Sequence, residues 1–125
     1  MKKKIFILGT LLLGCVFFAA AQVRQFDTDN DGTLDLAEVQ KAADAKFAHL
    51  DRNSEGTLDA KEVPGSMSAN VFAASDADND NTLDKTEYEK VVEARFNAAD
   101  SDHDGTLSNA ELHTPAGRAL LALIK

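Results

Sequence analysis

Residues 27–38 read DTDNDGTLDLAE, and three later stretches repeat this order of acids, small residues and hydroxyls. The repeats are residues 51–62 (DRNSEGTLDAKE), 76–87 (DADNDNTLDKTE) and 100–111 (DSDHDGTLSNAE). All but three of the 21 acids lie in these four windows. An internal repeat of this kind is the main organising feature of the chain.

The spacing of the oxygen-bearing side chains suits a hard divalent cation. Calcium takes six to eight oxygen ligands, which a loop of twelve residues supplies from positions 1, 3, 5, 7, 9 and 12. The first and fourth windows match the pattern D-x-[DN]-x-[DN]-G-x5-E throughout. The second departs at Glu55, and the third has Asn81 in place of the glycine.

The four windows resemble the calcium loops of the EF-hand family, and the resemblance covers nearly all of the chain after residue 21. It implies up to four bound Ca²⁺ ions. The ligands expected in the first two loops are Asp27, Asp29, Asp31, Thr33, Asp35 and Glu38, then Asp51, Asn53, Glu55, Thr57, Asp59 and Glu62. Those expected in the last two are Asp76, Asp78, Asp80, Thr82, Asp84 and Glu87, then Asp100, Asp102, Asp104, Thr106, Ser108 and Glu111.

We expect the second site to be the weakest. Glu55 is one methylene longer than the usual Asp or Asn, and Arg52 and Asn53 reduce the local negative charge. Asn81 is tolerable in the third loop, because Asn adopts left-handed backbone conformations more readily than most residues. Position 8 is Leu in every loop, and in the family this residue joins two loops through a short antiparallel β bridge. Which loops pair is left open.

The segments between the loops predict helices, so the expected fold is all-α: four EF-hand-like calcium loops joined by short helices, with short loop-to-loop β bridges. Apolar residues recur at helical spacing from Val39 to Leu50 and from Tyr88 to Ala99. Phe47, Phe72 and Phe96 each stand four residues before a loop and are assigned to the core. Residues 36–50 contain no Gly or Pro, so one helix about 22 Å long can leave the first loop and enter the second.

Pro and Gly residues mark the breaks in this pattern. Pro64-Gly65 is the expected hinge, which divides the domain of residues 22–125 into halves 22–64 and 65–125. Only residues 23–26 can form a helix before the first loop. Pro115 and Gly117 are expected to interrupt the exit from the fourth loop, and residues 119–124 to form a short helix that closes the core or, alternatively, docks on a partner.

Residues 1–21 have the composition of a signal peptide. Three lysines precede an apolar stretch of residues 5–18, and residues 19–21 are all Ala, a pattern that signal peptidases accept. We expect an exported periplasmic or secreted protein that starts at Gln22, and no stable membrane span, because the apolar stretch is short. Alternatively, residues 12–15 (LLGC) resemble a lipobox, which would anchor a lipoprotein through Cys15.

Charge and composition exclude several functions. The formal charge of −8 and the absence of a basic stripe in the sequence argue against nucleic acid as a partner. No nucleophile and base stand together, so an enzyme is not expected. We therefore expect a calcium buffer or a binding protein that calcium stabilises. The alternatives are a sensor that exposes an apolar groove to an unidentified protein target, which the single Met beyond the signal peptide disfavours, or a dockerin-like docking module, whose loops usually close with Asp instead of Glu.

Overall fold

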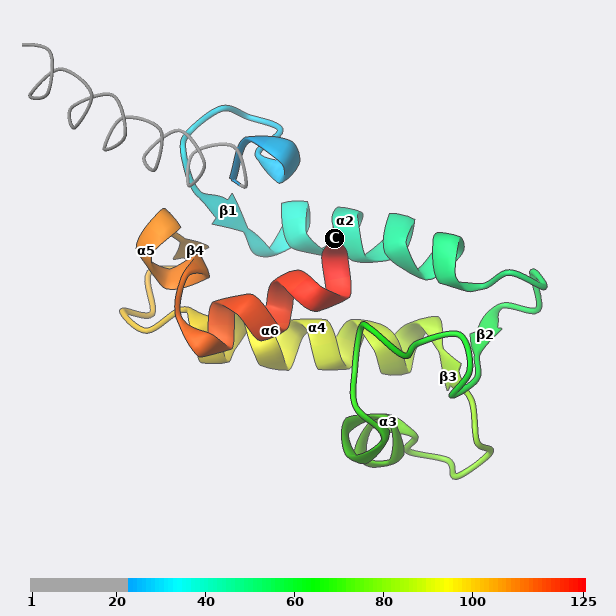
Figure 1. The fold of residues 1–125 in the computed structure, drawn as a ribbon. Helices are drawn as coiled ribbons and strands as arrows, with labels where there is room; N and C mark the ends of the chain where they lie inside the picture. The colour runs from blue at the N-terminus through cyan, green and yellow to red at the C-terminus, as the bar shows by residue number, and fades with distance from the viewer. Residues whose placement is uncertain (1–22) are drawn as a thin grey trace, which may run out of the picture.

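The computed structural model describes residues 23–125 (Figure 1). The predicted signal peptide and Cys15 lie outside these residues. Residues 23–26 are helical and lead into the first loop. The elements that follow are β1 (Leu34–Asp35), α2 (Leu36–Leu50), β2 (Thr57–Leu58), α3 (Ala69–Ser75), β3 (Leu83–Asp84), α4 (Lys85–Ala99), β4 (Thr106–Leu107), α5 (Asn109–Leu112) and α6 (Pro115–Ile124).

Two fifteen-residue helices, α2 and α4, each connect two loops. Each begins with a capping box: the side chain of Asp35 or Asp84 accepts a hydrogen bond from the backbone N–H of the glutamate three residues later, whose carboxylate accepts one in return. The prediction that one helix leaves the first loop and enters the second is confirmed. The two helices pack side by side and run in opposite directions (Figure 1).

Two short antiparallel ladders join the loops in pairs. Leu34 lies opposite Leu107 in the ladder of β1 with β4, and Leu58 lies opposite Leu83 in the ladder of β2 with β3. The first loop is therefore paired with the fourth, and the second with the third, at opposite ends of the α2–α4 pair (Figure 1). Each ladder joins a strand before Pro64 to a strand after it.

The core lies between α2, α4 and α6. The predicted apolar faces are confirmed, because Val39, Ala43, Tyr88 and Val92 are at most 1% exposed. The rings of Phe47 and Tyr88 meet edge to face with their centroids 5.6 Å apart. The phenol of Tyr88 donates a 2.6 Å hydrogen bond to the Leu123 carbonyl, which ties α4 to α6. The four position-8 leucines are fully buried and continue this core into both loop pairs.

The segment after the second loop forms turns instead of a helix, as predicted from Pro64. Asp59 accepts from the backbone N–H of Glu62, as a helix N-cap would, but proline has no N–H and its ring disfavours helical backbone in the residue before it. The chain therefore turns through residues 60–68 until Ser68 caps α3.

The expected interruption after the fourth loop is confirmed at Pro115: α5 ends at Leu112, Thr114 is the next N-cap, and Pro115 is the first residue of α6. The expectation for Gly117 is wrong, because it lies inside α6, and the terminal helix begins at Pro115 instead of at the expected residue 119. Proline is favoured at this position because its missing N–H would have no partner there. A Cβ atom at Gly117 would overlap backbone atoms of Glu111 and Leu112, so glycine allows α5 and α6 to approach closely. The expected terminal helix does close the core, with Leu120, Leu121, Leu123 and Ile124 buried.

Within residues 23–125, no helix has the length and apolar content needed to cross a membrane.

Candidate metal sites

All four loops share a left-handed backbone at two positions. Residues at positions 4 and 6 have positive φ, which places Asn30 at 59° and Gly32 at 82° in the first loop. In the third loop, Asn81 replaces the glycine at position 6 and adopts a φ of 65°. The replacement is tolerated because Asn adopts left-handed backbone more readily than most residues.

The position-1 aspartate organises each loop through backbone hydrogen bonds. One carboxylate oxygen of Asp27 accepts from the N–H of Gly32 at 2.9 Å, and the other accepts from the N–H of Asp31 at 3.2 Å. Asp51, Asp76 and Asp100 make the same two bonds in their own loops. Each loop is thus curled around its first carboxylate by N–H donors.

The position-12 glutamate closes three of the loops in one way. The carboxylate of Glu38 accepts from the backbone N–H of Thr28 at 2.7 Å and from that of Asp35 at 3.0 Å, which draws the end of the loop back to its beginning. Glu87 and Glu111 make the corresponding bonds to Ala77 and Ser101 at 2.7 and 2.8 Å. These three glutamates are only 6–7% exposed, so their carboxylates face the loop interior.

Carboxylates converge in the same three loops. Four acids in the third loop and four in the fourth place one oxygen atom each within 4.8 Å of the others, and three acids do so in the first loop. The groups are Asp76, Asp78, Asp80 and Glu87; Asp100, Asp102, Asp104 and Glu111; and Asp27, Asp29 and Glu38. Asp31 is outside the first group. Clustered carboxylate oxygens are the donor set that calcium takes in proteins.

The second loop is more open than the others. Its closing bond is missing: Glu62 accepts from the N–H of Asp59 at 3.1 Å, but no bond from the N–H of Arg52 is found. Asp51 and Glu62 are half-buried, whereas the residues at positions 1 and 12 of the other three loops are buried. The difference has a local cause, because no helix follows this loop to hold its position-12 carboxylate against the loop entrance.

Threonine hydroxyls fix the position-5 aspartates in the three closed loops. Thr33 donates from its backbone N–H and its hydroxyl to the same oxygen of Asp31, both at 2.9 Å. Thr82 and Thr106 do the same to Asp80 and Asp104, whereas Glu55 receives no such bond from Thr57. Binding of calcium by these threonines, which is expected to use their backbone carbonyls because position 7 of such a loop supplies a carbonyl ligand, stays a prediction.

The environment at position 3 raises the pKa of its carboxyl. Loss of surrounding water and hydrogen bonds with Asp76 and Asp80 raise the pKa of Asp78 to about 6. Loss of water and a hydrogen bond with Asp100 also raise the pKa of Asp102, and a hydrogen bond with Asp27 raises that of Asp29. At position 5, the N–H of Thr82 lowers the pKa of Asp80. A negative charge at position 3 is therefore disfavoured by its acidic neighbours, and a divalent cation would remove that penalty.

The residue at position 9 also caps the helix that follows the loop, a role that was not among the sequence predictions. Asp35, Asp84 and Ser108 are the N-caps of α2, α4 and α5, so each closed loop ends inside a capping box. The signal was present in the sequence, because each of these residues is followed three positions later by Glu. A change in the side-chain conformation at position 9 or 12 would therefore disturb the first turn of the helix that follows the loop.

Three stretches of the chain, residues 21–43, 69–92 and 91–114, match the family model described as EF hand. Together they cover more than half of the 125 residues. The chain belongs to the EF-hand family. Its first, third and fourth loops lie within the matched residues, and the second loop lies outside them. Among curated proteins, none matches the chain.

The EF-hand matches therefore fall on the three loops whose carboxylates converge. Family membership and the acidic clusters both support calcium binding. The chemistry and the backbone of these loops fit this cation. Each loop has grouped carboxylates, a residue with left-handed backbone at position 6 and a buried glutamate at position 12.

Proposed function

We propose that this EF-hand protein binds three calcium ions strongly, at its first, third and fourth loops, and a fourth weakly at its second loop. The observation that carries the proposal is the convergence of carboxylate oxygens to within 4.8 Å in three loops. Bound calcium would neutralise this charge, while Glu38, Glu87 and Glu111 would supply the closing carboxylate of each site.

We further propose that the protein is a calcium buffer or a calcium-stabilised binding protein without catalytic activity. Each end of the α2–α4 pair carries two loops joined by a ladder, so occupied loops would hold both ends of the core together. Calcium at 100 times its dissociation constant adds about 2.7 kcal/mol to the stability for each independent site. In the absence of calcium, repulsion among the loop acids opposes folding.

Thermal unfolding followed by circular dichroism, in excess calcium and in excess chelator, tests this proposal. We expect a higher melting temperature with calcium and reduced binding of a dye that reports exposed apolar surface. An unchanged melting temperature would contradict calcium stabilisation. Increased dye binding with calcium would instead favour the sensor, whose groove opens upon binding. The packing of α6 onto α2 and α4 favours the first result, because its leucines already fill the core.

Export is the final part of the proposal, and it rests on the three lysines, the apolar stretch and the three alanines of residues 2–21. We propose a periplasmic or secreted protein beginning at Gln22. Mass spectrometry of the processed protein tests this: the mass of residues 22–125 supports release, and a lipid-modified Cys15 would show a lipoprotein instead.

A further inference from the structure

One face of this acidic protein is basic. A cavity of about 950 Å³ lies between α2, α6, the end of α5 and the turns after the second loop. Its lining contains Lys46, Arg52, Arg118 and Lys125, with Glu62 as the only acid. After the three lysines of residues 2–4, the chain has only ten Lys and Arg residues, so this lining gathers four of them.

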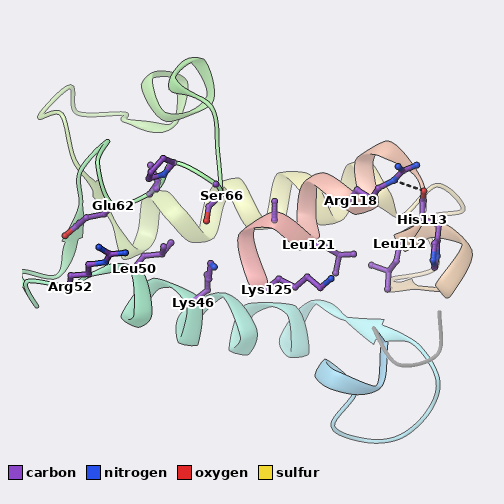
Figure 2. A pocket seen from close by; sticks show the side chains of 14 residues that line it. Lys46, Leu50, Arg52, Glu62, Ser66, Leu112, His113, Arg118, Leu121 and Lys125 are labelled. Atoms are coloured by element: carbon purple, nitrogen blue, oxygen red, sulfur yellow. Dashed lines mark hydrogen bonds between the residues drawn. The ribbon is translucent and has the colours of Figure 1, made fainter. Parts of the chain in front are cut away.

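The cations are spread along the whole cavity. Figure 2 shows Arg52 near one end, Lys46 and Lys125 in the middle, and Arg118 with His113 at the other end. A second cavity of about 490 Å³ adjoins the first, because Lys46 and Lys125 line both, and it adds Lys41 and His49. The basic surface thus continues beyond one cavity.

Neighbouring acids do not neutralise this surface. Asp44, the acid of α2 that lies outside the loops, points to α4 and pairs with Lys85 at 3.3 Å. In residues 23–125, no ion pair involves Lys46, Arg52, Arg118 or Lys125. The acids lining the two cavities are Glu62 and Glu38, and both accept hydrogen bonds from backbone N–H groups of their own loops. These two carboxylates keep their charge, but neither forms an ion pair with the four cations, so Lys46, Arg52 and Lys125 can pair with a ligand. Arg118 already donates from Nε to the His113 carbonyl at 3.1 Å.

Apolar side chains lie between the cations. Leu50, Pro64 and Ala122 line the larger cavity and are not fully buried, and Figure 2 shows Leu50 between Arg52 and Lys46. A single anionic group would meet only one of the cations. A ligand that satisfies this arrangement carries several negative charges separated by apolar groups, which is the chemistry of a peptide segment with acidic and apolar residues.

We propose that this basic cavity is a docking site for an acidic, amphipathic segment of a partner protein. Carboxylates of the segment pair with Lys46, Lys125 and Arg52, and its apolar side chains contact Leu50, Pro64 and Ala122. The site lies outside the carboxylate clusters and does not depend on calcium binding for its charge. Occupied calcium sites would strengthen it, because neutralising the loop acids reduces the negative field that opposes an acidic ligand.

Fluorescence anisotropy of two labelled peptides tests the proposal. The first is an amphipathic peptide built from glutamate and leucine, and the second has lysine in place of every glutamate. With the full chain in excess calcium, we expect the glutamate peptide to bind, to bind less tightly as salt is raised, and the lysine peptide to bind much more weakly. Equal or tighter binding of the lysine peptide, or no binding of the glutamate peptide, would overturn the proposal.

Charge-reversal variants locate the site. Lys46→Glu and Lys125→Glu are each expected to weaken binding of the glutamate peptide by about tenfold. Lys90→Glu is the matched control, since Lys90 is an exposed cation on α4 that lines neither cavity. If Lys46→Glu lowers the melting temperature, its weaker binding could reflect lost stability, and Lys125→Glu and Arg52→Glu are used in its place. Both of these residues are exposed, so their substitution should not disturb the core. An equal loss in Lys90→Glu would overturn the assignment.

Vesicles of phosphatidylglycerol provide the last arm of the experiment. If they bind the protein through Lys46 and Lys125 while the glutamate peptide does not, the basic cavity faces a lipid surface and the peptide proposal is wrong. Calcium binding by the loops is measured separately, by titration with calcium alone. A failure of the calcium proposal can therefore be distinguished from a failure of the docking proposal.

Discussion

At the scale of single residues, position 12 distinguishes the four loops. Glu38, Glu87 and Glu111 are buried and bond to the N–H at position 2, whereas Glu62 is half-buried and lacks that bond. We predict that Glu→Gln at each of the three closed loops removes one strong calcium site, because the amide supplies a single neutral oxygen where calcium needs a bidentate carboxylate. Glu62→Gln should change the titration little. Equal losses from all four substitutions would show that the second loop is as strong as the others.

Position 6 gives a second prediction at this scale. Gly105 has a φ of 83°, and a Cβ atom there would meet nothing within 4 Å, so Gly105→Ala introduces backbone strain without a clash. We expect it to cost about 1–2 kcal/mol of folding free energy and to weaken the fourth site. Gly65→Ala is the matched control, since it also meets no atom within 4 Å and Gly65 is not among the positive-φ glycines. Equal melting temperatures for Gly105→Ala and Gly65→Ala would contradict a cost of backbone strain at position 6.

The raised pKa of Asp78 predicts a pH dependence for the calcium-free protein. A carboxyl that titrates at about 6 in the folded state and at 3.8 in the unfolded state binds more protons when folded, so folding stability falls as pH rises between these values. Acids with a lowered pKa, such as Asp80 and Asp104, act in the opposite sense, so the contribution of Asp78 is measured against Asp78→Asn. In chelator, the melting temperature of the protein should rise relative to that of Asp78→Asn as pH is lowered from 7 towards 4. An unchanged difference between the two over this range would contradict the assigned environment of Asp78.

At the scale of elements, much of the molecule followed from the sequence. The helices at residues 36–50 and 85–99 were predictable because apolar residues recur at helical spacing and neither segment contains Gly or Pro. The break after the second loop followed from Pro64. The start of α6 did not, because the terminal helix was expected from residue 119, whereas Pro115 both follows the end of α5 and occupies the first helical position, which proline favours.

Loop pairing could not be predicted, and the reason is physical. Position 8 is Leu in all four loops, so any two loops present the same residue to a ladder. Which two meet is decided by the antiparallel packing of α2 and α4, a long-range contact that local patterns do not report. The calcium ligands, in contrast, are local to twelve residues and were predicted in all four loops, with the second the weakest, and the structure groups carboxylates in the other three.

The ladders predict that calcium sites are coupled in pairs. Leu107→Ala should cost about 2–5 kcal/mol of folding free energy, because the leucine is fully buried opposite Leu34. It should also weaken binding at the first and fourth loops while sparing the third. Leu83→Ala is the comparison, and we expect it to weaken the third loop and spare the other two. Calorimetric titration of both variants separates these outcomes, and identical effects on all sites would contradict pairwise coupling.

At the scale of the whole molecule, charge is separated into two surfaces. The acids gather in the loops at both ends of the α2–α4 pair, and four of the ten cations that follow residue 4 gather along the cavity between α2 and α6. The sequence hides this separation, because Lys46, Arg52, Arg118 and Lys125 come from distant segments and form no basic run. The basic face forms because the fold packs α6 against α2.

The two surfaces would serve different ligands. Calcium would occupy the loops, which the two ladders join in pairs, while the basic cavity is built from side chains outside the loops, apart from Arg52 and Glu62 of the second loop. The most open loop thus borders the cavity.

Calorimetric titration of the purified protein with calcium tests the central claim most directly. We predict three strong binding events per chain, with any fourth event much weaker, because three loops gather their carboxylates and the second does not. Heat from four equivalent sites would contradict the distinction between the loops, and the absence of binding would contradict the assignment of calcium to this protein.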